Sequence, residues 1–463
     1  MTSRSLVPDF PRYLSVPFAL GGFALLCLTV AGSSVLTLGT MPARFCVGAL
    51  LLLICALGLF LLYREGCPSA TVFALLLPLA AVLYLRLLCL DHQTHDYYTF
   101  LAKWAAFFRE NGGFSALSLS VGDYNVPYLY FLAAISYIDI PDLYLIKLFS
   151  ILFDVLMAWA GMRLCRTLCR DSSPAPVICF LLMLWLPTFT LNGAYWGQCD
   201  SMYVFFILLA FYAVMEGRPK ASVFLLSLAF SLKLQTVFLI PLWCVFLFAR
   251  RVKFRHLFIF PAGYALTILP ALLMGRPLLD ILSIYVSQTT EYNHRLVLNA
   301  ATAYAFIPYY AEVNEKLFAL LGIILAFLLV FFVLGVLFFN RKKMTQEHFL
   351  AAATVMAIGV PFLLPHMHER YFYLAGAVSL VWACCNRKRV PIALLTEISS
   401  LSCYCTYLRL KYTLPFRFAG MYFVMAFEAA VMLAALVWSI CVFLRQIRQE
   451  GPSKPLSNQN FST

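Results

Sequence analysis

Long apolar runs, repeated along almost the whole chain, constrain its fold more than any other feature. Hydrophobic residues make up 63% of the 463 residues and charged residues only 12%. A soluble domain averages about 45–50% apolar and about 25% charged residues, and a helix that crosses a bilayer needs about 20 apolar residues. These runs indicate an all-α polytopic integral membrane protein and exclude a soluble globular one.

The apolar runs predict about 13 or 14 transmembrane helices. The expected spans are residues 15–38, 45–63, 69–90, 142–164, 175–193, 200–216, 221–249, 257–275, 316–340, 348–364, 371–386, 391–408 and 418–444. Residues 221–249 are expected to form two short helices. Because no polar linker interrupts the runs, residues 1–450 are predicted to be a single transmembrane domain, followed by a disordered cytoplasmic tail at 451–463.

The net charge of +13 is best explained by membrane orientation. Short basic clusters such as ARRVKFR (249–255), NRKK (340–343) and NRKRV (386–390) follow predicted spans. Lys and Arg are concentrated in cytoplasmic loops, so both termini are expected in the cytoplasm. Membrane lipids are therefore expected partners and nucleic acid is not.

The same rule places two long segments on the outer side. Residues 127–138 are too short to cross, so residues 91–141 are predicted to form one external loop with amphipathic helices. Residues 276–315 are predicted to form a second external loop.

Unusual polar side chains gather in these loops and in the outer halves of the spans. Such groups are costly at membrane depth and usually line a cavity or pathway, so they predict an active site or a transport vestibule on the outer face. The set comprises Asp91, His92, His95, Asp96, Asp123, Gln198, Asp200, Lys233, Gln288, Glu291, His294, Arg295, Asn299, His366, His368, Glu369 and Arg370.

Asp96 opens the first external loop. It precedes an aromatic stripe of Phe100, Trp104, Phe107 and Phe108, whose spacing predicts an amphipathic helix at the membrane interface. The Asp96 carboxylate therefore has two possible roles: an N-terminal cap of that helix or a general base at the edge of an apolar cavity. Asp91 and Asp123 are possible second carboxylates, with a structural role favoured for each.

The segment LPHMHERYFY (364–373) places two His, a Glu and an Arg between two predicted spans. A metal site is disfavoured because the helical HExxH spacing is absent. The Arg370 guanidinium and the imidazoles of His366 and His368 are better suited to an anion, since Arg presents a fork of donors that matches phosphate oxygens. No cofactor is expected, and a metal-independent reaction is predicted.

Two further tracts carry candidate side chains. Lys233 is the only charge in the apolar stretch 221–249, and it could extend its ammonium group to the membrane surface or pair with a phosphate. The tract AYWGQCDSMY (194–203) places Trp196, Gln198 and Asp200 at a helix junction. Trp196 could instead belong to the interfacial aromatic belt.

The order of these motifs resembles that of the GT-C glycosyltransferases that use polyprenyl-phosphate sugars. HDYYTFLAKW, GDYNVPYLY, WGQCDS, LKLQTVFLIP, NAATAY and HMHERY follow one another between residues 91 and 373. The likeness is closest to bacterial relatives of the second mannosyltransferase of glycosylphosphatidylinositol synthesis. It is more distant to the endoplasmic-reticulum glucosyltransferases that extend lipid-linked oligosaccharide.

The resemblance implies roles for particular residues. Asp96 would be the catalytic base. The acceptor side of the cavity would include Asp123, Tyr124, Trp196, Gln198 and Asp200. The donor phosphate would be bound by Lys233, Arg295, His366, His368, Glu369 and Arg370. Two departures leave the sugar and the acceptor open: Asn125-Val126-Pro127 stands where the glucosyltransferases have two prolines, and Arg370 where they have Lys.

The expected function is therefore an inverting hexosyltransferase with an outward-facing site in a bacterial plasma membrane. The resemblance favours mannose, with glucose as the alternative, and the acceptor could be a glycan, a lipid or a protein. Two other functions remain open: a transporter or flippase of lipid-linked sugars, and a pyrophosphate-dependent glycan ligase. The one-sided polar set and the lack of an internal repeat argue against the transporter.

Overall fold

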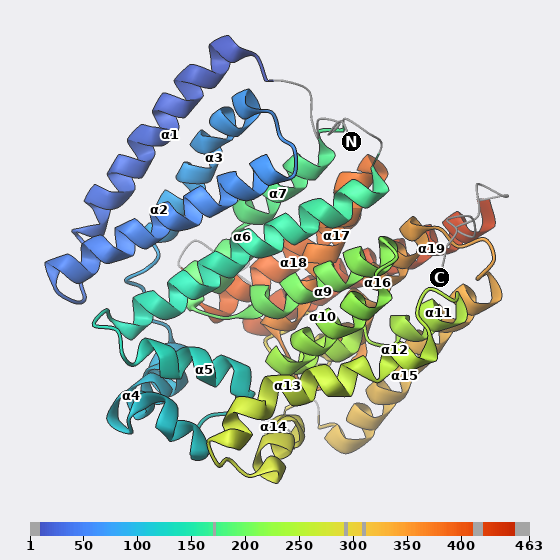
Figure 1. Cartoon of the computed structure of the whole chain (residues 1–463). Helices are drawn as coiled ribbons and strands as arrows, with labels where there is room; N and C mark the ends of the chain where they lie inside the picture. The colour runs from blue at the N-terminus through green and yellow to red at the C-terminus, as the bar shows by residue number, and fades with distance from the viewer. Residues whose placement is uncertain (1–9, 170–172, 291–294, 308–311, 411–419, 450–463) are drawn as a thin grey trace. The chain divides into compact units, whose positions relative to one another are not determined.

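The computed structural model of the chain is built almost entirely from helices (Figure 1). It describes residues 10–169, 173–290, 295–307, 312–410 and 420–449. The predicted tail at 451–463 lies outside these ranges, as do Glu291 and His294. Within them the only strands are β1 (Val297–Leu298) and β2 (Met367–His368). The predicted all-α fold is confirmed.

The chain forms two compact units, which we describe separately. Unit 1 comprises residues 1–209, 228–233 and 262–288, and unit 2 comprises residues 210–227, 234–261 and 289–463. Four helices contribute residues to both units: α9 (Asp200–Met215), α10 (Pro219–Leu232), α13 (Ile259–Leu273) and α14 (Leu278–Thr290).

Unit 1 contains the N-terminal helices and several short distorted turns. Its remaining elements are α1 (Arg12–Ser33), α2 (Met41–Arg64), α3 (Ser69–Leu87), the π-helix η1 (Tyr97–Leu101), α4 (Ala102–Glu110), the 3-10 helix η2 (Gly113–Ser118), α5 (Val126–Ile135), α6 (Asp142–Leu168), α7 (Ala175–Trp185), α8 (Pro187–Thr190) and the π-helix η3 (Leu191–Trp196).

Unit 2 contains the C-terminal helices and the two short strands. Its remaining elements are the 3-10 helix η4 (Leu234–Phe238), α11 (Leu242–Phe248), α12 (Phe254–Leu257), η5 (Ala303–Phe306), α15 (Glu315–Phe339), α16 (Gln346–Leu363), η6 (Glu369–Phe372), α17 (Tyr373–Cys385), η7 (Arg387–Arg389), α18 (Val390–Tyr407) and α19 (Gly420–Gln449).

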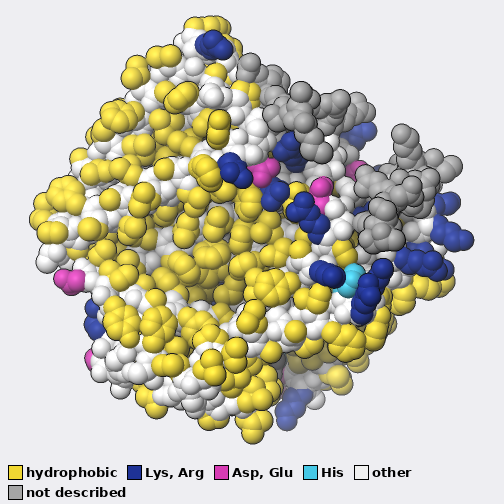
Figure 2. Space-filling view, viewed as in Figure 1, with side chains coloured by type: hydrophobic (Ala, Val, Ile, Leu, Met, Phe, Trp, Pro, Cys, Tyr) yellow, Lys and Arg dark blue, Asp and Glu magenta, His cyan; other side chains and the backbone are white. Residues whose placement is uncertain are grey.

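Eight helices in the described ranges are long and apolar enough to cross a membrane. They are Arg12–Ser33, Met41–Arg64, Ser69–Leu87, Asp142–Leu168, Phe254–Leu273, Glu315–Phe339, Gln346–Leu363 and Met425–Arg448. Helix α7 and the segment Pro187–Trp196, bent by 51° at a short break, would make a ninth span if they cross together. The chain is therefore a multi-pass membrane protein, and hydrophobic side chains cover the visible surface of α1, α2 and α3 (Figure 2).

The predicted number of about 13 or 14 crossings is larger because it includes apolar runs that form shorter helices. Helices α9 and α10 have 16 and 14 residues. At a rise of 1.5 Å per residue they extend about 24 and 21 Å, less than the roughly 30 Å of a hydrocarbon core. The two short helices predicted within residues 221–249 are confirmed as α10 and α11, and they are separated by the 3-10 turn η4.

The predicted first external loop folds onto the body of unit 1. Helix α5 has ten residues, too few to cross, and it is buried rather than amphipathic: Leu129 and Leu132 belong to one hydrophobic core with Phe108 of α4. The predicted aromatic stripe therefore packs at least partly against protein, because Phe108 is fully buried and Trp104 and Phe107 lie against the same core.

Candidate active site

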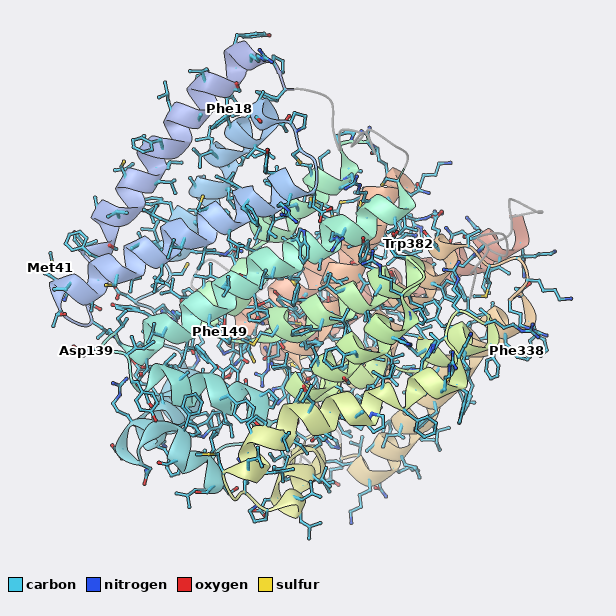
Figure 3. All side chains as sticks on the ribbon, viewed as in Figure 1. Phe18, Met41, Asp139, Phe149, Phe338 and Trp382 are labelled. Carbon is cyan, nitrogen blue, oxygen red and sulfur yellow. The ribbon has the colours of Figure 1, made fainter. Side chains whose placement is uncertain are left out.

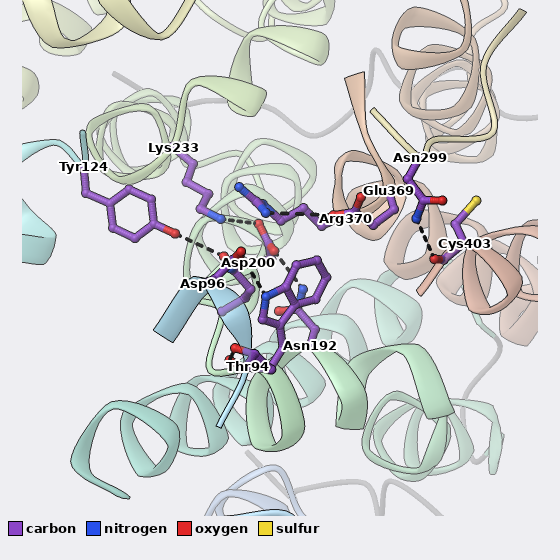
Figure 4. Close-up of polar contacts among 12 residues, drawn as sticks. Thr94, Asp96, Tyr124, Asn192, Asp200, Lys233, Asn299, Glu369, Arg370 and Cys403 are labelled. Carbon is purple, nitrogen blue, oxygen red and sulfur yellow. Dashed lines mark hydrogen bonds and ion pairs between the residues drawn. The ribbon is translucent and has the colours of Figure 1, made fainter. Parts of the chain in front are cut away.

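Asp96 is held by two side chains that lie about a hundred residues further along the chain. Its Oδ2 atom accepts hydrogen bonds from Trp196 Nε1 at 3.0 Å and from Gln198 Nε2 at 2.9 Å. Although Asp96 immediately precedes η1, its side chain makes no capping hydrogen bond to that helix. The capping alternative is therefore wrong, and the carboxylate is directed into a buried polar cluster (Figure 4).

The two donors come from a distorted segment whose local sequence explains its shape. Helix α7 ends at Trp185, helical structure resumes at Pro187, and η3 ends at Trp196. The next residue, Gly197, has a φ of +85° that favours glycine. The amide nitrogen of Gln198 donates to the carbonyl of Asn192 at 2.9 Å. This turn aims the indole of Trp196 and the amide of Gln198 at Asp96. Trp196 is fully buried and does not belong to an aromatic belt.

A buried ion pair lies in the same cluster of unit 1. Lys233 Nζ is 2.6 Å from Asp200 Oδ1, and Asn192 Nδ2 donates to Asp200 Oδ2 at 2.8 Å. Lys233 follows α10 and Asp200 begins α9, so each charge sits where a short helix begins or ends. Both side chains are nearly inaccessible. A buried lysine in this position does not extend to the membrane surface.

Tyr124 contacts both Gln198, which donates to Asp96, and Lys233. Its hydroxyl donates to Gln198 Oε1 at 3.1 Å, and its ring centre lies 5.6 Å from Lys233 Nζ, within cation–π range. The edge-on rings of Trp104 and Tyr128 hold the phenol in place, at centroid distances of 5.3 and 4.8 Å. The cluster therefore contains one carboxylate held by neutral donors, one paired ammonium group and a phenol between them.

Unlike the side chain of its neighbour Tyr124, the side chain of Asp123 does not enter the buried cluster. Its side chain is exposed, and its carboxylate makes no hydrogen bond or ion pair with any residue that the structure describes. Its backbone carbonyl accepts a hydrogen bond from the amide of Gln288. Of the predicted acceptor-side residues, the structure thus brings Tyr124, Trp196, Gln198 and Asp200 around Asp96, and leaves the Asp123 carboxylate at the surface.

An apolar pocket of about 180 Å³ adjoins this cluster in unit 1. Side chains of α5, α6, α9, α10 and α13 line it, among them Tyr128, Phe149 and Leu232. Figure 3 labels Phe149 on α6, and Figure 2 shows a largely hydrophobic surface between α6 and α13. The hydroxyls of Ser231 and Thr267 in the lining already donate to backbone carbonyls, so the pocket is suited to an apolar occupant.

The pocket and the cluster lie at the same depth along α6. Phe149 is seven residues from the start of this helix at Asp142, or about 10 Å along its axis. The next residue, Ser150, donates its hydroxyl to the carbonyl of Gln198 at 2.8 Å. Tyr128 also contacts Tyr124, and Leu232 precedes Lys233 in the chain. The pocket is therefore lined by side chains that contact the cluster or adjoin it in the chain.

In unit 2, two short strands join the other predicted motifs. β1 pairs with β2 in parallel, with Val297 beside Met367 and Leu298 beside His368. The imidazole Nδ1 of His366 lies 2.7 Å from the carbonyl oxygen of Arg295. Because a carbonyl only accepts, this nitrogen carries the proton. His366 has a φ of +62°, a conformation that is costly for a residue other than glycine and is frequent at functional sites.

The charged residues that follow β2 differ sharply in exposure. Glu369 is fully buried and Arg370 is partly exposed, and their closest charged atoms are 3.9 Å apart. The ring of His368 packs edge-on against Tyr371 at 5.3 Å. A metal held by three side chains needs three ligand atoms close together. In the described part of the chain, the ligand atoms of His366, His368 and Glu369 do not all lie within 4.8 Å of one another. This geometry does not favour a three-ligand metal site, and metal-independent chemistry stays a prediction.

Asn299 is anchored in the same unit. It has a φ of +56°, and its side-chain amide donates to the carbonyl of Cys403 at 3.0 Å (Figure 4). The thiol of Cys403 donates in turn to Glu428 Oε2 at 3.2 Å. These contacts fix the end of β1 against α18 and α19.

The comparison with protein families decides the class. The model of glycosyltransferase family 87 matches residues 124–365, just over half of the chain. The chain belongs to glycosyltransferase family 87. No curated protein sequence matches it significantly.

Membership in family 87 shows that this multi-pass protein is a membrane glycosyltransferase, which acts on a sugar donor and an acceptor in a lipid environment. The matched range contains Tyr124, Trp196, Gln198, Asp200, Lys233 and Arg295. Asp96 precedes it, and His366 to Arg370 follow it. The family match therefore supports the enzyme class predicted from the motifs, while the sugar, the donor lipid and the base remain predictions.

Several polar residues of this family 87 protein were not predicted as site residues. The side-chain amide of Asn192 donates a hydrogen bond to Asp200. The side-chain amide of Asn125 donates to the carbonyl of Ser231 and to the hydroxyl of Tyr285. Lys147 and Asp154 are fully buried within α6. Their presence in an otherwise apolar span was the available signal, because charged groups at membrane depth are usually functional or paired.

Proposed function

We propose that the chain transfers a hexose from a polyprenyl-phosphate donor to an acceptor hydroxyl, with inversion at the anomeric carbon and Asp96 as the general base. The main support is the position of the Asp96 carboxylate. Two N–H donors hold it in a buried cluster that also contains Lys233, and an apolar pocket adjoins that cluster. This is the combination that a substrate with a charged head and a lipid tail requires.

The lipid part of the donor is expected to occupy the apolar pocket. Since α6 is long and apolar enough to cross a membrane and supplies Phe149 and Phe153 to the lining, we place the pocket at bilayer depth, where a hydrocarbon chain is the abundant ligand. The first isoprene units in the pocket would place the phosphate near Lys233. The Asp200 carboxylate holds the ammonium group of Lys233 in position until the donor binds. The phosphate then either replaces Asp200 as the partner of the ammonium group or shares the ammonium group with Asp200.

Bond formation at the anomeric carbon follows from this placement. The acceptor O–H donates its proton to Asp96, and its oxygen attacks the anomeric carbon on the face opposite the phosphate. The carbon–oxygen bond to the phosphate then breaks, and its electron pair leaves with the polyprenyl phosphate. Lys233 stabilises the developing negative charge as a preorganised cation in a site of low dielectric constant. Trp196 and Gln198 orient the carboxylate.

The resemblance assigns the donor phosphate to further residues of unit 2. Arg370 and Arg295 would supply guanidinium donors, and His366 and His368 would supply imidazole donors. Glu369 would hold Arg370, which lies 3.9 Å away. Fixed cations can supply the charge stabilisation for which other enzymes use a metal, so the proposed reaction needs no cofactor.

The sugar is proposed as one of two hexoses, and the acceptor is proposed only by chemical class. The resemblance to the second mannosyltransferase of glycosylphosphatidylinositol synthesis favours mannose, with glucose as the alternative. The acceptor is a glycan, a lipid or a protein, and the site faces outward from a bacterial plasma membrane with both termini in the cytoplasm. These assignments rest on the motifs and on the distribution of Lys and Arg.

A donor panel tests the proposal. The purified protein is incubated with polyprenyl-phosphate mannose, glucose and other hexoses and with the matching pyrophosphate donors, in the presence of membrane extract. The released lipid is then identified by mass spectrometry. Release of free polyprenyl monophosphate, with a product of opposite anomeric configuration, is expected. Release of pyrophosphate lipid would instead identify a ligase, and retention of configuration would exclude direct attack by the acceptor.

A further inference from the structure

We propose that Lys147 is a positioning residue that holds the chain segment carrying Asp96. This inference rests on the proposed role of Asp96 as the base. It concerns a residue of α6 whose ammonium group contacts only the backbone between α3 and η1.

All three donors of the Lys147 ammonium group are used. Nζ lies 2.8 Å from the carbonyl oxygen of Cys89, 3.1 Å from that of Leu90 and 2.6 Å from that of His92. An ammonium group has three donors and no acceptor, so three backbone carbonyls satisfy it completely. The side chain is 1% exposed. An isolated buried ammonium group is very costly, and these bonds offset that cost.

The bonded carbonyls explain why a cation is needed there. They lie in the turn that follows the end of α3 at Leu87, and their oxygens converge on one point, where a cation offsets their partial negative charge. The chain then turns towards Asp96 without regular structure. Lys147 neutralises these three carbonyl oxygens and fixes the turn.

A second anchor holds the same segment at Asp91. Its carboxylate accepts hydrogen bonds from the amide nitrogen and the hydroxyl of Thr37, each at 3.0 Å, and from the hydroxyl of Tyr144 at 2.5 Å. The Tyr144 oxygen also accepts from the amide of Leu38 at 2.8 Å. Thr37 and Leu38 form the connection between α1 and α2, so the N-terminal helices are tied to this segment. Asp91 thus has a structural role, as the sequence favoured.

The far end of the segment is fixed at Thr94. Its hydroxyl donates to the carbonyl of Trp196 at 3.2 Å, and the indole of the same Trp196 donates to Asp96. The backbone before the base is therefore held by three side chains: Lys147, which binds three of its carbonyls, Asp91 and Thr94. Because a displacement of about 1 Å in a reacting group can cost about 100-fold in rate, loosening this segment is expected to slow the chemical step.

Lys147→Met tests the proposal because it keeps the length of the side chain and removes the ammonium group. We expect kcat to fall about 100-fold while KM for the donor stays within about twofold, since Lys147 contacts only backbone carbonyls of the chain. Lys147→Arg retains a cation and donors and is expected to recover part of the loss. The matched control is Lys103→Met on α4, where an exposed lysine has no partner in the described chain.

Hydrogen exchange provides a second measurement that does not depend on turnover. Lys147→Met is expected to increase amide exchange in residues 88–96, with α15 to α18 unchanged. Asp91→Asn, which weakens the second anchor, is expected to increase exchange in the same residues and at 37–38. Wild-type kcat and unchanged exchange in Lys147→Met would overturn the proposal. Absence of transfer by the wild type would contradict the proposed function but leave the exchange result interpretable.

Discussion

Unit 1 buries two lysines in very different ways. Lys233 pairs with a side-chain carboxylate, Asp200, at 2.6 Å, and it lies next to the apolar pocket. Lys147 bonds to three backbone carbonyls and does not line the pocket. The first lysine has a partner that a ligand anion can replace, whereas the second is saturated by groups that cannot move away without unfolding a turn. We therefore propose that Lys233 stabilises the donor phosphate and that Lys147 positions the segment that carries Asp96.

The largest effect is expected from Lys233→Met. Removing a preorganised charge from a reacting phosphate is expected to lower kcat about 1,000-fold. It also leaves Asp200 buried without its counter-ion, which typically costs about 3–5 kcal/mol of stability. Turnover by the release assay and thermal unfolding in detergent measure the two effects.

The double variant Lys233→Met with Asp200→Asn separates these effects. Removing both charges is expected to restore most of the lost stability but none of the activity, because the phosphate still lacks its cation. Recovery of activity together with stability would show that the pair is only structural.

An intermediate effect is expected from Trp196→Phe. This change removes the Trp196 Nε1–H donor to Asp96 and preserves most of the buried ring. A hydrogen bond to a charged group contributes about 1.5–3 kcal/mol, so kcat should fall about 10- to 100-fold with little change in KM for the donor. A change confined to KM would place Trp196 in substrate binding instead of in orienting the base.

The smallest effect is expected from Asp123→Asn. Its carboxylate is exposed and has no described partner, and a substitution of this kind usually changes stability by less than about 0.5 kcal/mol. Activity within about twofold of the wild type is expected in the release assay. A loss of tenfold or more would restore the role that the resemblance assigns to Asp123 on the acceptor side.

The sequence predicted the fold class because apolar runs report burial in a membrane directly. The number of crossings stays a prediction. Eight helices in the described ranges have the length and composition of a span, and other apolar runs contain helix breaks that hydropathy does not detect, such as the turn at Lys233 that separates α10 from α11.

The sequence also predicted most members of the cluster around Asp96, since charged and amide side chains in apolar surroundings are conspicuous. Their pairing could not be predicted. Asn192 reaches Asp200 because η3 is a π-helix that ends just before Gly197, and Lys147 reaches three carbonyls because α3 ends beside α6. Such contacts depend on tertiary packing, which residue type and spacing alone do not specify.

The proposed role of Asp96 as the base is tested by turnover and donor binding of Asp96→Asn, with Asp139→Asn as the matched control at an exposed position. The asparagine keeps the size of the side chain and a carbonyl oxygen for Trp196 and Gln198, but it cannot accept the acceptor proton. We predict that release of polyprenyl phosphate becomes undetectable while the donor still binds with near wild-type affinity. Turnover of Asp96→Asn within about tenfold of the control, well above what loss of a general base allows, would contradict the account.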